Sequence, residues 1–233
     1  MILSIETATT VGSVALHQEG KLVGSYELHL ERSHASAITQ LIEHLLKISD
    51  VRMTDIQAIA ISKGPGSYTG LRIGTSTAKG LCFGLDIPLI AVNTLQAMAK
   101  SVSKFYQHQA VLLCPMIDAR RMEVYTAYFT PDMGSVKETH AKIINENSFK
   151  AELSERQVVL FGNGAPKCAA VLQHPQLHLI EGVSPQAREI GEIASQKFMQ
   201  QEFEDLAYFE PFYLKDFVAG KPKNKVLGHL INH

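Results

Sequence analysis

The sequence predicts an α/β protein built from two similar units, each a mixed sheet covered by helices. Two observations predict this class. Three short apolar segments separated by turn residues open the chain, and helical and strand patterns then alternate. A similar order begins again after the polar stretch 101–109. We therefore expect two lobes, 1–103 and 104–218, although the two halves show no clear sequence repeat.

The first lobe is expected to open as a meander. Glu19 and Gly20 suit a hairpin turn, and Ser33 is a candidate N-cap for a helix in which Ile38, Leu41 and Leu45 recur at helical spacing. The predicted strands of this lobe are 2–5, 12–17, 21–28, 55–62 and 88–92, and the predicted helices are 33–48, 70–84 and one that begins at Thr94.

The second lobe shows the same order less clearly. The predicted strands are 111–117, 124–128 and 158–161, with an irregular segment before the last, and the predicted helices are 166–172 and 185–200. Residues 219–233 have no convincing periodicity, so we expect a tail or a docking segment.

Composition indicates a globular protein. Hydrophobic residues make up 45% of the 233 residues and charged residues 19%. No segment approaches the roughly 20 apolar residues of a membrane span. The first residues do not resemble a signal peptide. We expect a cytoplasmic protein.

Charge and cysteine usage narrow the function classes. The net charge of −1 and the interleaved charges do not suggest a protein that binds nucleic acid alone, and the cluster Lys221, Lys223 and Lys225 is a weak signal. The three cysteines, at 82, 114 and 168, are too widely spaced to suggest a disulfide framework or a zinc site.

The segment with the most candidate functional features is 63–80. Gly64 and Gly66 flank Pro65 there in a sharp turn between a strand and a helix. Exposed N–H groups there could receive an anion, but the Lys-Ser/Thr pair of a P-loop is missing, and the segment also lacks a nucleophile elbow. The helix that follows carries small residues every four positions, at Gly70, Gly74, Ala78 and Cys82. Such a stripe predicts close packing, either inside the monomer or against another chain.

Histidines give no convincing metal site. His229 and His233 have helical ligand spacing but lie at the end of the chain, and Pro175 between His174 and His178 indicates a loop. The segment 118–125, with Arg120 and Arg121, is either a polar turn or a binding surface.

Taken together, several segments resemble the TsaB (YeaZ) family of tRNA threonylcarbamoyladenosine biosynthesis. The matching segments are Ile-Glu-Thr-Ala-Thr at 5–9, Ser-Val-Ala-Leu at 13–16, Gly-Pro-Gly-Ser-Tyr-Thr-Gly-Leu-Arg-Ile-Gly at 64–74, Pro-Leu-Ile-Ala-Val-Asn-Thr-Leu at 88–95, Ile-Asp-Ala-Arg-Arg-Met-Glu-Val-Tyr at 117–125 and Glu-Pro-Phe-Tyr-Leu-Lys at 210–215. The resemblance implies an actin/hexokinase-like fold with two ribonuclease-H-like lobes. It also implies a partner role: such proteins bind the related enzyme TsaD and, with TsaE, support threonylcarbamoyl transfer to the adenosine beside the anticodon of ANN-decoding tRNAs.

Comparison with TsaD implies that the chain has no catalytic centre. Thr94 and Met98 stand where TsaD carries two metal-ligating histidines, Thr10 stands where it has an Asp in its first phosphate turn, and a later metal-binding Asp falls near Pro185. We therefore expect no catalytic residue, no metal and no intrinsic cofactor. A nucleotide at the interface with TsaD stays possible.

The resemblance also implies a docking interface on two helices of the first lobe. The partner would be TsaD, with TsaE in a larger assembly and tRNA reached through the complex, or a second copy of this chain when TsaD is absent. The expected contact residues are His34, Ile38, Leu41, Ile42, Leu45, Gly70, Gly74, Thr77, Ala78 and Leu81. A bulky charged residue at Gly74 or Ala78 should then abolish association but leave a folded monomer.

Two enzymatic alternatives remain. A nucleotide-dependent kinase of the same architecture could use the segment 162–165 as a second phosphate loop, and it would have to bind ATP and magnesium as an isolated protein. A metallopeptidase would require a bound metal.

Overall fold

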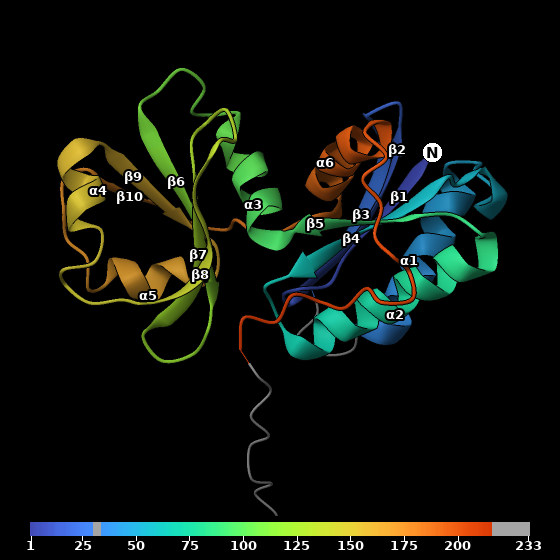
Figure 1. Ribbon diagram of the computed structural model, residues 1–233, viewed down its shortest axis with the longest axis horizontal. Helices are drawn as coiled ribbons and strands as arrows, with labels where there is room; N and C mark the ends of the chain where they lie inside the picture. The colour runs from blue at the N-terminus through green and yellow to red at the C-terminus, as the bar shows by residue number, and fades with distance from the viewer. Residues whose placement is uncertain (30–33, 216–233) are drawn as a thin grey trace, which may run out of the picture.

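The computed structural model describes residues 1–29 and 34–215, with residues 34–36 described by their backbone alone. It contains two five-stranded mixed sheets, one in each lobe (Figure 1). The strands of the first sheet are β1 (Ile2–Glu6), β2 (Val11–Gln18), β3 (Lys21–His29), β4 (Ala58–Gly64) and β5 (Leu89–Asn93). Those of the second are β6 (Val111–Asp118), β7 (Glu123–Phe129), β8 (Ser135–Ile143), β9 (Gln157–Phe161) and β10 (Leu177–Ile180).

The two sheets have the same topology. Their orders are β3-β2-β1-β4-β5 and β8-β7-β6-β9-β10, which match strand for strand. The first strand of each lobe pairs antiparallel with the second and parallel with the fourth. The expected α/β class, with two mixed sheets of ribonuclease-H-like order covered by helices, is confirmed.

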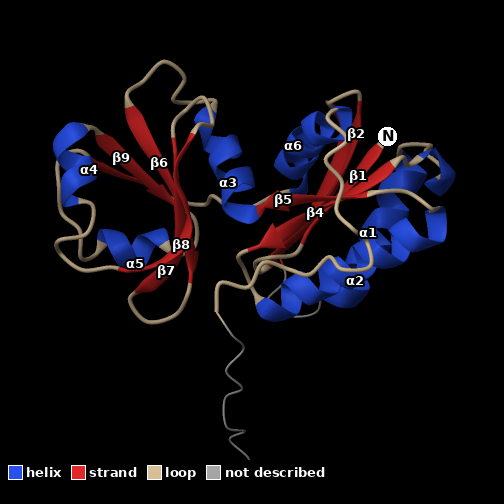
Figure 2. Cartoon of the chain, viewed as in Figure 1, coloured by secondary structure: helices blue, strands red, loops and turns tan. Residues whose placement is uncertain are grey.

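Helices cover both faces of the first sheet (Figure 2). Its covering helices are α1 (His34–Ile48) and α2 (Tyr68–Leu85) on one face and α6 (Ala187–Met199) on the other. Because side chains alternate along a strand, Leu3 and Ile5 belong to the core under α1 and α2, whereas Ile2 packs with α6. The remaining helices are α3 (Thr94–Ser103), α4 (Lys150–Glu155) and α5 (Ala165–Ala169), with a 3₁₀ turn at Met53–Asp55.

The helices do not follow the expected division at residue 103. Helix α3 packs on the second sheet, where Leu95 and Val102 share a core with Leu113 and Phe161. Helix α6 comes from the second half of the chain but packs on the first sheet through Ile190 and Ala194. The ranges 1–103 and 104–218 therefore separate the two sheets but not the helices. Helix α3 belongs to the first range and packs on the second sheet, and α6 belongs to the second range and packs on the first sheet.

Residues 203–215, which we call the strap, continue along the first lobe after α6. The Glu204 N–H donates to Leu89 O at 2.9 Å, and the Phe209 side chain is buried in the core under α1 and α2. Figure 1 shows the strap beside α2, reaching the junction of the lobes at its end. The expected tail 219–233, with His229 and His233, lies outside the described residues, as does Ser33.

Two sequence segments form strands that the patterns did not predict. Strand β8 is mostly exposed and lies at a sheet edge, so its sequence lacks an apolar face. Strand β10 has only four residues, too short for a pattern to show. In the described part of the chain, no helix combines the length and hydropathy of a membrane span.

Candidate functional site

The small-residue stripe of α2 packs inside the first lobe. A Cβ on Gly70 would lie 2.0 Å from Thr7 O, and one on Gly74 would lie 2.4 Å from Thr7 Oγ1. The Thr7 hydroxyl also donates to Gly70 O at 2.8 Å. Ala78 and Cys82 are buried in the core of this lobe. Of the two possibilities left open by the stripe, the structure shows packing within the monomer.

This packing corrects the expected contact residues. Ile38, Ile42 and Leu45 are at most 3% exposed and belong to the same core as Ala78, while Gly70 and Gly74 are buried. These six residues lie on the faces of α1 and α2 that pack toward the sheet. Leu41, Thr77 and Leu81 are half-buried, and the side chain of His34 lies outside the described residues. A bulky charged residue at Gly74 or Ala78 is therefore expected to disrupt the lobe itself.

A groove between α1 and α2 remains accessible on the first lobe. Its volume is about 310 Å³. It is lined by Thr39, Ile42, Glu43, Leu46, Val51, Met53, Thr77 and Leu81. Ile42, Thr77 and Leu81 were among the expected contacts, whereas Val51 and Met53 come from the connection after α1, which helical periodicity does not report. An apolar floor with a polar rim is typical of a surface that receives a partner side chain.

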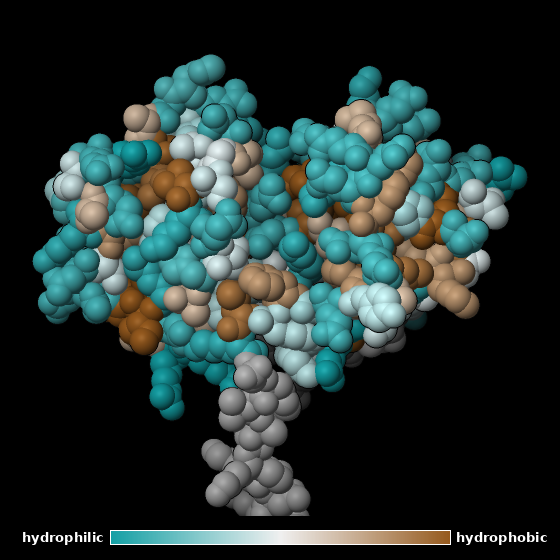
Figure 3. Space-filling view, viewed as in Figure 1, coloured by the Kyte–Doolittle hydropathy of each residue, from teal (hydrophilic) through white to brown (hydrophobic). Residues whose placement is uncertain are grey.

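The surface outside this groove gives a weaker signal. On the face shown in Figure 3, hydrophilic side chains cover most of the surface, and hydrophobic ones appear in separate small patches. Scattered apolar residues of this kind are normal for a folded protein and need no binding role.

The junction of the lobes gathers the carboxyl ends of the central strands, where ligands bind in open α/β sheets. Where α3 meets the end of β9, this junction is closely packed. Thr94 and Met98 are 0% and 1% exposed, and a Cβ on Gly162, which follows β9, would lie 2.5 Å from Met98 Cε. Asn93 Nδ2 donates to Thr139 Oγ1 across the junction at 2.9 Å. A thioether and a hydroxyl buried in this way do not fit the two-histidine metal site that the resemblance places at positions 94 and 98.

Glu6 is a fully buried carboxylic acid at the end of β1. Its Oε1 accepts a hydrogen bond from Ala8 N at 2.5 Å, and Oε2 has no hydrogen-bond partner among the residues that the structure describes. Burial raises the pKa of Glu6 to about 7, although the hydrogen bond from Ala8 opposes the rise. The carboxyl group is therefore partly protonated near neutral pH.

The raised pKa of Glu6 predicts a pH-dependent stability. The folded pKa is about 7 and the ordinary value is 4.5, so the folded state binds more protons between these values. Stability therefore falls as the pH rises from 4.5 to 7, because ionising the buried carboxyl group costs free energy.

Glu6→Gln should remove this slope, which urea unfolding at several pH values would measure. Subtracting the two profiles cancels the opposite effect of His17, whose pKa is lowered by burial. Parallel profiles would contradict the assignment.

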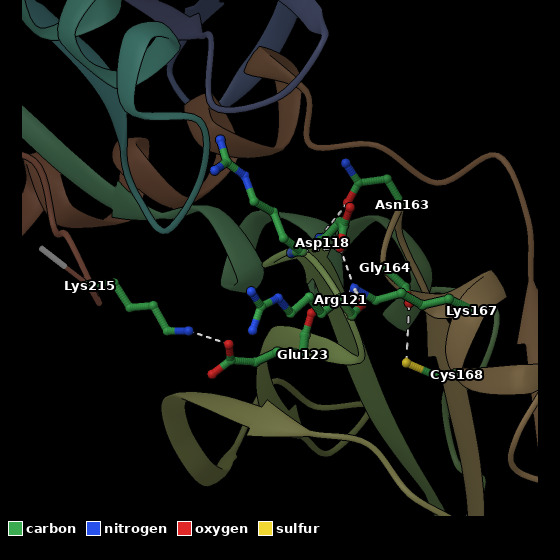
Figure 4. Close-up of polar contacts among 9 residues, drawn as sticks. Asp118, Arg121, Glu123, Asn163, Gly164, Lys167, Cys168 and Lys215 are labelled. Atoms are coloured by element: carbon green, nitrogen blue, oxygen red, sulfur yellow. Dashed lines mark hydrogen bonds and ion pairs between the residues drawn. The ribbon is translucent and has the colours of Figure 1, made fainter. Parts of the chain in front are cut away.

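The second lobe contributes a polar turn at the junction, residues 118–123, which we call the arginine turn (Figure 4). Lys167 contacts this turn at three points. Its Nζ pairs with the Asp118 carboxylate and donates hydrogen bonds to Arg121 O and Glu123 O, each at 2.7 Å. Asn163 Oδ1 accepts from Asp118 N at 2.9 Å. The strap reaches the same turn, because Lys215 pairs with Glu123.

The other candidate ligands are not brought together. His178 lies in β10 and His174 in the loop before it, so the predicted loop around Pro175 is observed. Cys82, Cys114 and Cys168 are buried and unpaired. Among the described residues, no group of three or more His, Cys, Asp or Glu side chains is arranged to hold a metal ion.

Comparison with known proteins agrees with these features. Residues 27–223 match the family described as TsaD, tRNA N6-adenosine threonylcarbamoyltransferase. The chain is 34% identical to the tRNA threonylcarbamoyladenosine biosynthesis protein TsaB of Escherichia coli K12, covering 94% of this chain and 96% of that protein. It is 32% identical to TsaB of Haemophilus influenzae, covering 94% and 95%. The structure of YeaZ from Pseudomonas aeruginosa superposes with a TM-score of 0.79 at 25% identity, covering 91% of this chain and 99% of that one.

The duplicated lobes and the matched family place this protein among the relatives of the threonylcarbamoyltransferase TsaD. Within that class, the chain belongs to the TsaB (YeaZ) family and has a role in tRNA threonylcarbamoyladenosine biosynthesis.

Proposed function

We propose that the chain is a non-catalytic subunit that binds TsaD and, with TsaE in a larger assembly, supports threonylcarbamoyl transfer to the adenosine beside the anticodon of ANN-decoding tRNAs. The observation that carries the non-catalytic part is the contact between Met98 and Gly162. Met98 packs against Gly162 where the resemblance to TsaD places a metal-ligating histidine. A residue buried in this contact leaves neither an imidazole nor space for an ion at that position.

The groove between α1 and α2 supports the docking part of the proposal. Because this protein and TsaD are related, each presents similar helices, and such surfaces pair readily about an approximate two-fold axis. The groove offers the apolar contacts of Leu46, Val51 and Met53 beside the polar rim of Thr39 and Glu43. In the absence of TsaD, a second copy of the chain would occupy the same surface.

The test is size-exclusion chromatography with light scattering on this protein, on TsaD from the same cell and on their mixture. A new peak at the heterodimer mass is expected. Repeating the run with ATP and magnesium tests whether a nucleotide is held at the interface, which would raise the amount of complex. Two unmixed peaks under both conditions would contradict the proposal.

Calorimetry separates the proposal from the kinase alternative. A kinase has to bind ATP and magnesium as an isolated protein, whereas the packed contact of Met98 with Gly162 predicts no such binding by this chain alone. Tight binding of ATP and magnesium to the isolated chain would instead support the kinase alternative, with the segment 162–165 as its phosphate loop.

A further inference from the structure

The arginine turn has an unusual backbone for its sequence. Arg120 and Arg121 have φ angles of 70° and 49°, so two consecutive residues adopt the left-handed conformation. Glycine and asparagine are the usual residues at such positions, and each other residue costs about 1 kcal/mol or more. The turn is nonetheless ordered, with hydrogen bonds from Ala119 N to Glu123 O and from Glu123 N to Arg120 O. Strain at two arginines suggests that their side chains have a role outside folding.

Among the described residues, the charges around the turn leave these two arginines without acidic partners. Asp118 is paired with Lys167, and Glu123 is paired with Lys215. Within residues 1–29 and 34–215, neither Arg120 nor Arg121 forms an ion pair, and both are exposed. The two carboxylates of the turn, Asp118 and Glu123, are thus each paired with a lysine rather than with Arg120 or Arg121.

Lys167 fixes the position of the backbone that carries Arg120 and Arg121. The Lys167 side chain is 23% exposed and joins both strands of the hairpin through its three contacts. Figure 4 shows Arg121 extending away from Lys167 on the side of the turn where Lys215 lies. The backbone N–H of Phe212, three residues before Lys215, donates a hydrogen bond to Lys63 O of the first lobe at 2.7 Å, so the arginines lie at the junction of the two lobes. Because the backbone of the turn is already fixed, less conformational freedom is lost when a ligand binds.

We propose that the arginine turn binds backbone phosphate groups of the tRNA substrate. This inference rests on the proposed function, because it assumes that the chain acts in a complex on tRNA. Guanidinium groups are suited to phosphate oxygens, and contacts of this kind position an RNA without reading its sequence. The exposure of both arginines fits a ligand with charge spread along its surface better than a small nucleotide in an enclosed pocket.

The experiment measures how tightly the complex of this chain with TsaD binds an unmodified tRNA transcript at several salt concentrations. Arg120→Gln combined with Arg121→Gln should weaken binding on the order of tenfold and reduce the slope of log affinity against log salt by about 1.5. Arg120→Lys combined with Arg121→Lys keeps the charge and should retain most of the slope. The control pair, Lys150→Gln with Arg156→Gln, removes the same charge from the two ends of α4, at the far end of the second lobe, and should change neither quantity (Figure 1).

Each other outcome overturns the inference. An unchanged slope in the Arg120/Arg121 variant, or an equal loss in the control pair, would exclude a specific phosphate contact. A change confined to ATP binding would assign the turn to a nucleotide. Loss of co-elution with TsaD would make it a protein contact. Failure of the unmodified chain to co-elute with TsaD would instead contradict the proposed function.

Discussion

Thr77→Arg is expected to abolish TsaD binding while leaving the chain folded. Thr77 is half-buried and lines the groove between α1 and α2, and its hydroxyl donates to Ile73 O of the same helix at 3.0 Å. Because that hydrogen bond is internal to α2, its loss leaves no buried polar group of the core unpaired. An arginine there places a charged group over the apolar floor of the groove. We expect affinity to fall at least about 100-fold, or roughly 3 kcal/mol.

The control is Ser76→Arg, which adds the same side chain to the neighbouring, exposed position of α2. Light scattering measures association, and thermal unfolding shows whether each variant is folded. The expected result is a Ser76 variant that binds as the unmodified chain does. If both variants bind TsaD, or if both fail, the groove is not the docking surface.

The sequence predicted the first lobe better than the second for a physical reason. Strands β1, β2 and β4 are almost entirely buried, so their apolar runs are strong. Strand β8 pairs with one neighbour only and is mostly exposed, so its sequence of Lys, Glu, Thr and His carries little signal. A similar order of elements in the two lobes was nevertheless predicted from the stronger patterns, although β8 and β10 were missed.

The sequence could not predict on which sheet each helix packs. Periodicity shows that Ile190 and Ala194 share a face of α6, but not which sheet receives that face. The exchange of α3 and α6 between lobes depends on how the connections run in space, as does the path of the strap along the first lobe. Prediction of the candidate site met the same limit. The apolar positions on α1 and α2 were identified from the sequence, but they were assigned to a partner interface rather than to the core.

Gly70→Ala is expected to destabilise the first lobe strongly. The new methyl group would lie 2.0 Å from Thr7 O, a backbone atom that cannot move without shifting the turn between β1 and β2. The Thr7 hydroxyl bond to Gly70 O ties the same two segments together. Overpacking of this kind typically costs about 1–3 kcal/mol, and here it outweighs the gain of about 1 kcal/mol in helix propensity. Urea unfolding measures the difference, and the melting temperature should fall by several degrees.

Gly80→Ala separates this steric effect from helix propensity, because Gly80 lies in the same helix and a Cβ there would meet nothing within 4 Å. This variant should be more stable than the unmodified chain by up to about 1 kcal/mol. Opposite signs at two glycines of one helix would show that the amino-terminal part of α2 is shaped by contact with Thr7. If Gly70→Ala were instead stable and merely unable to bind TsaD, the small-residue stripe would face the partner after all, and the groove would lose its place as the docking surface.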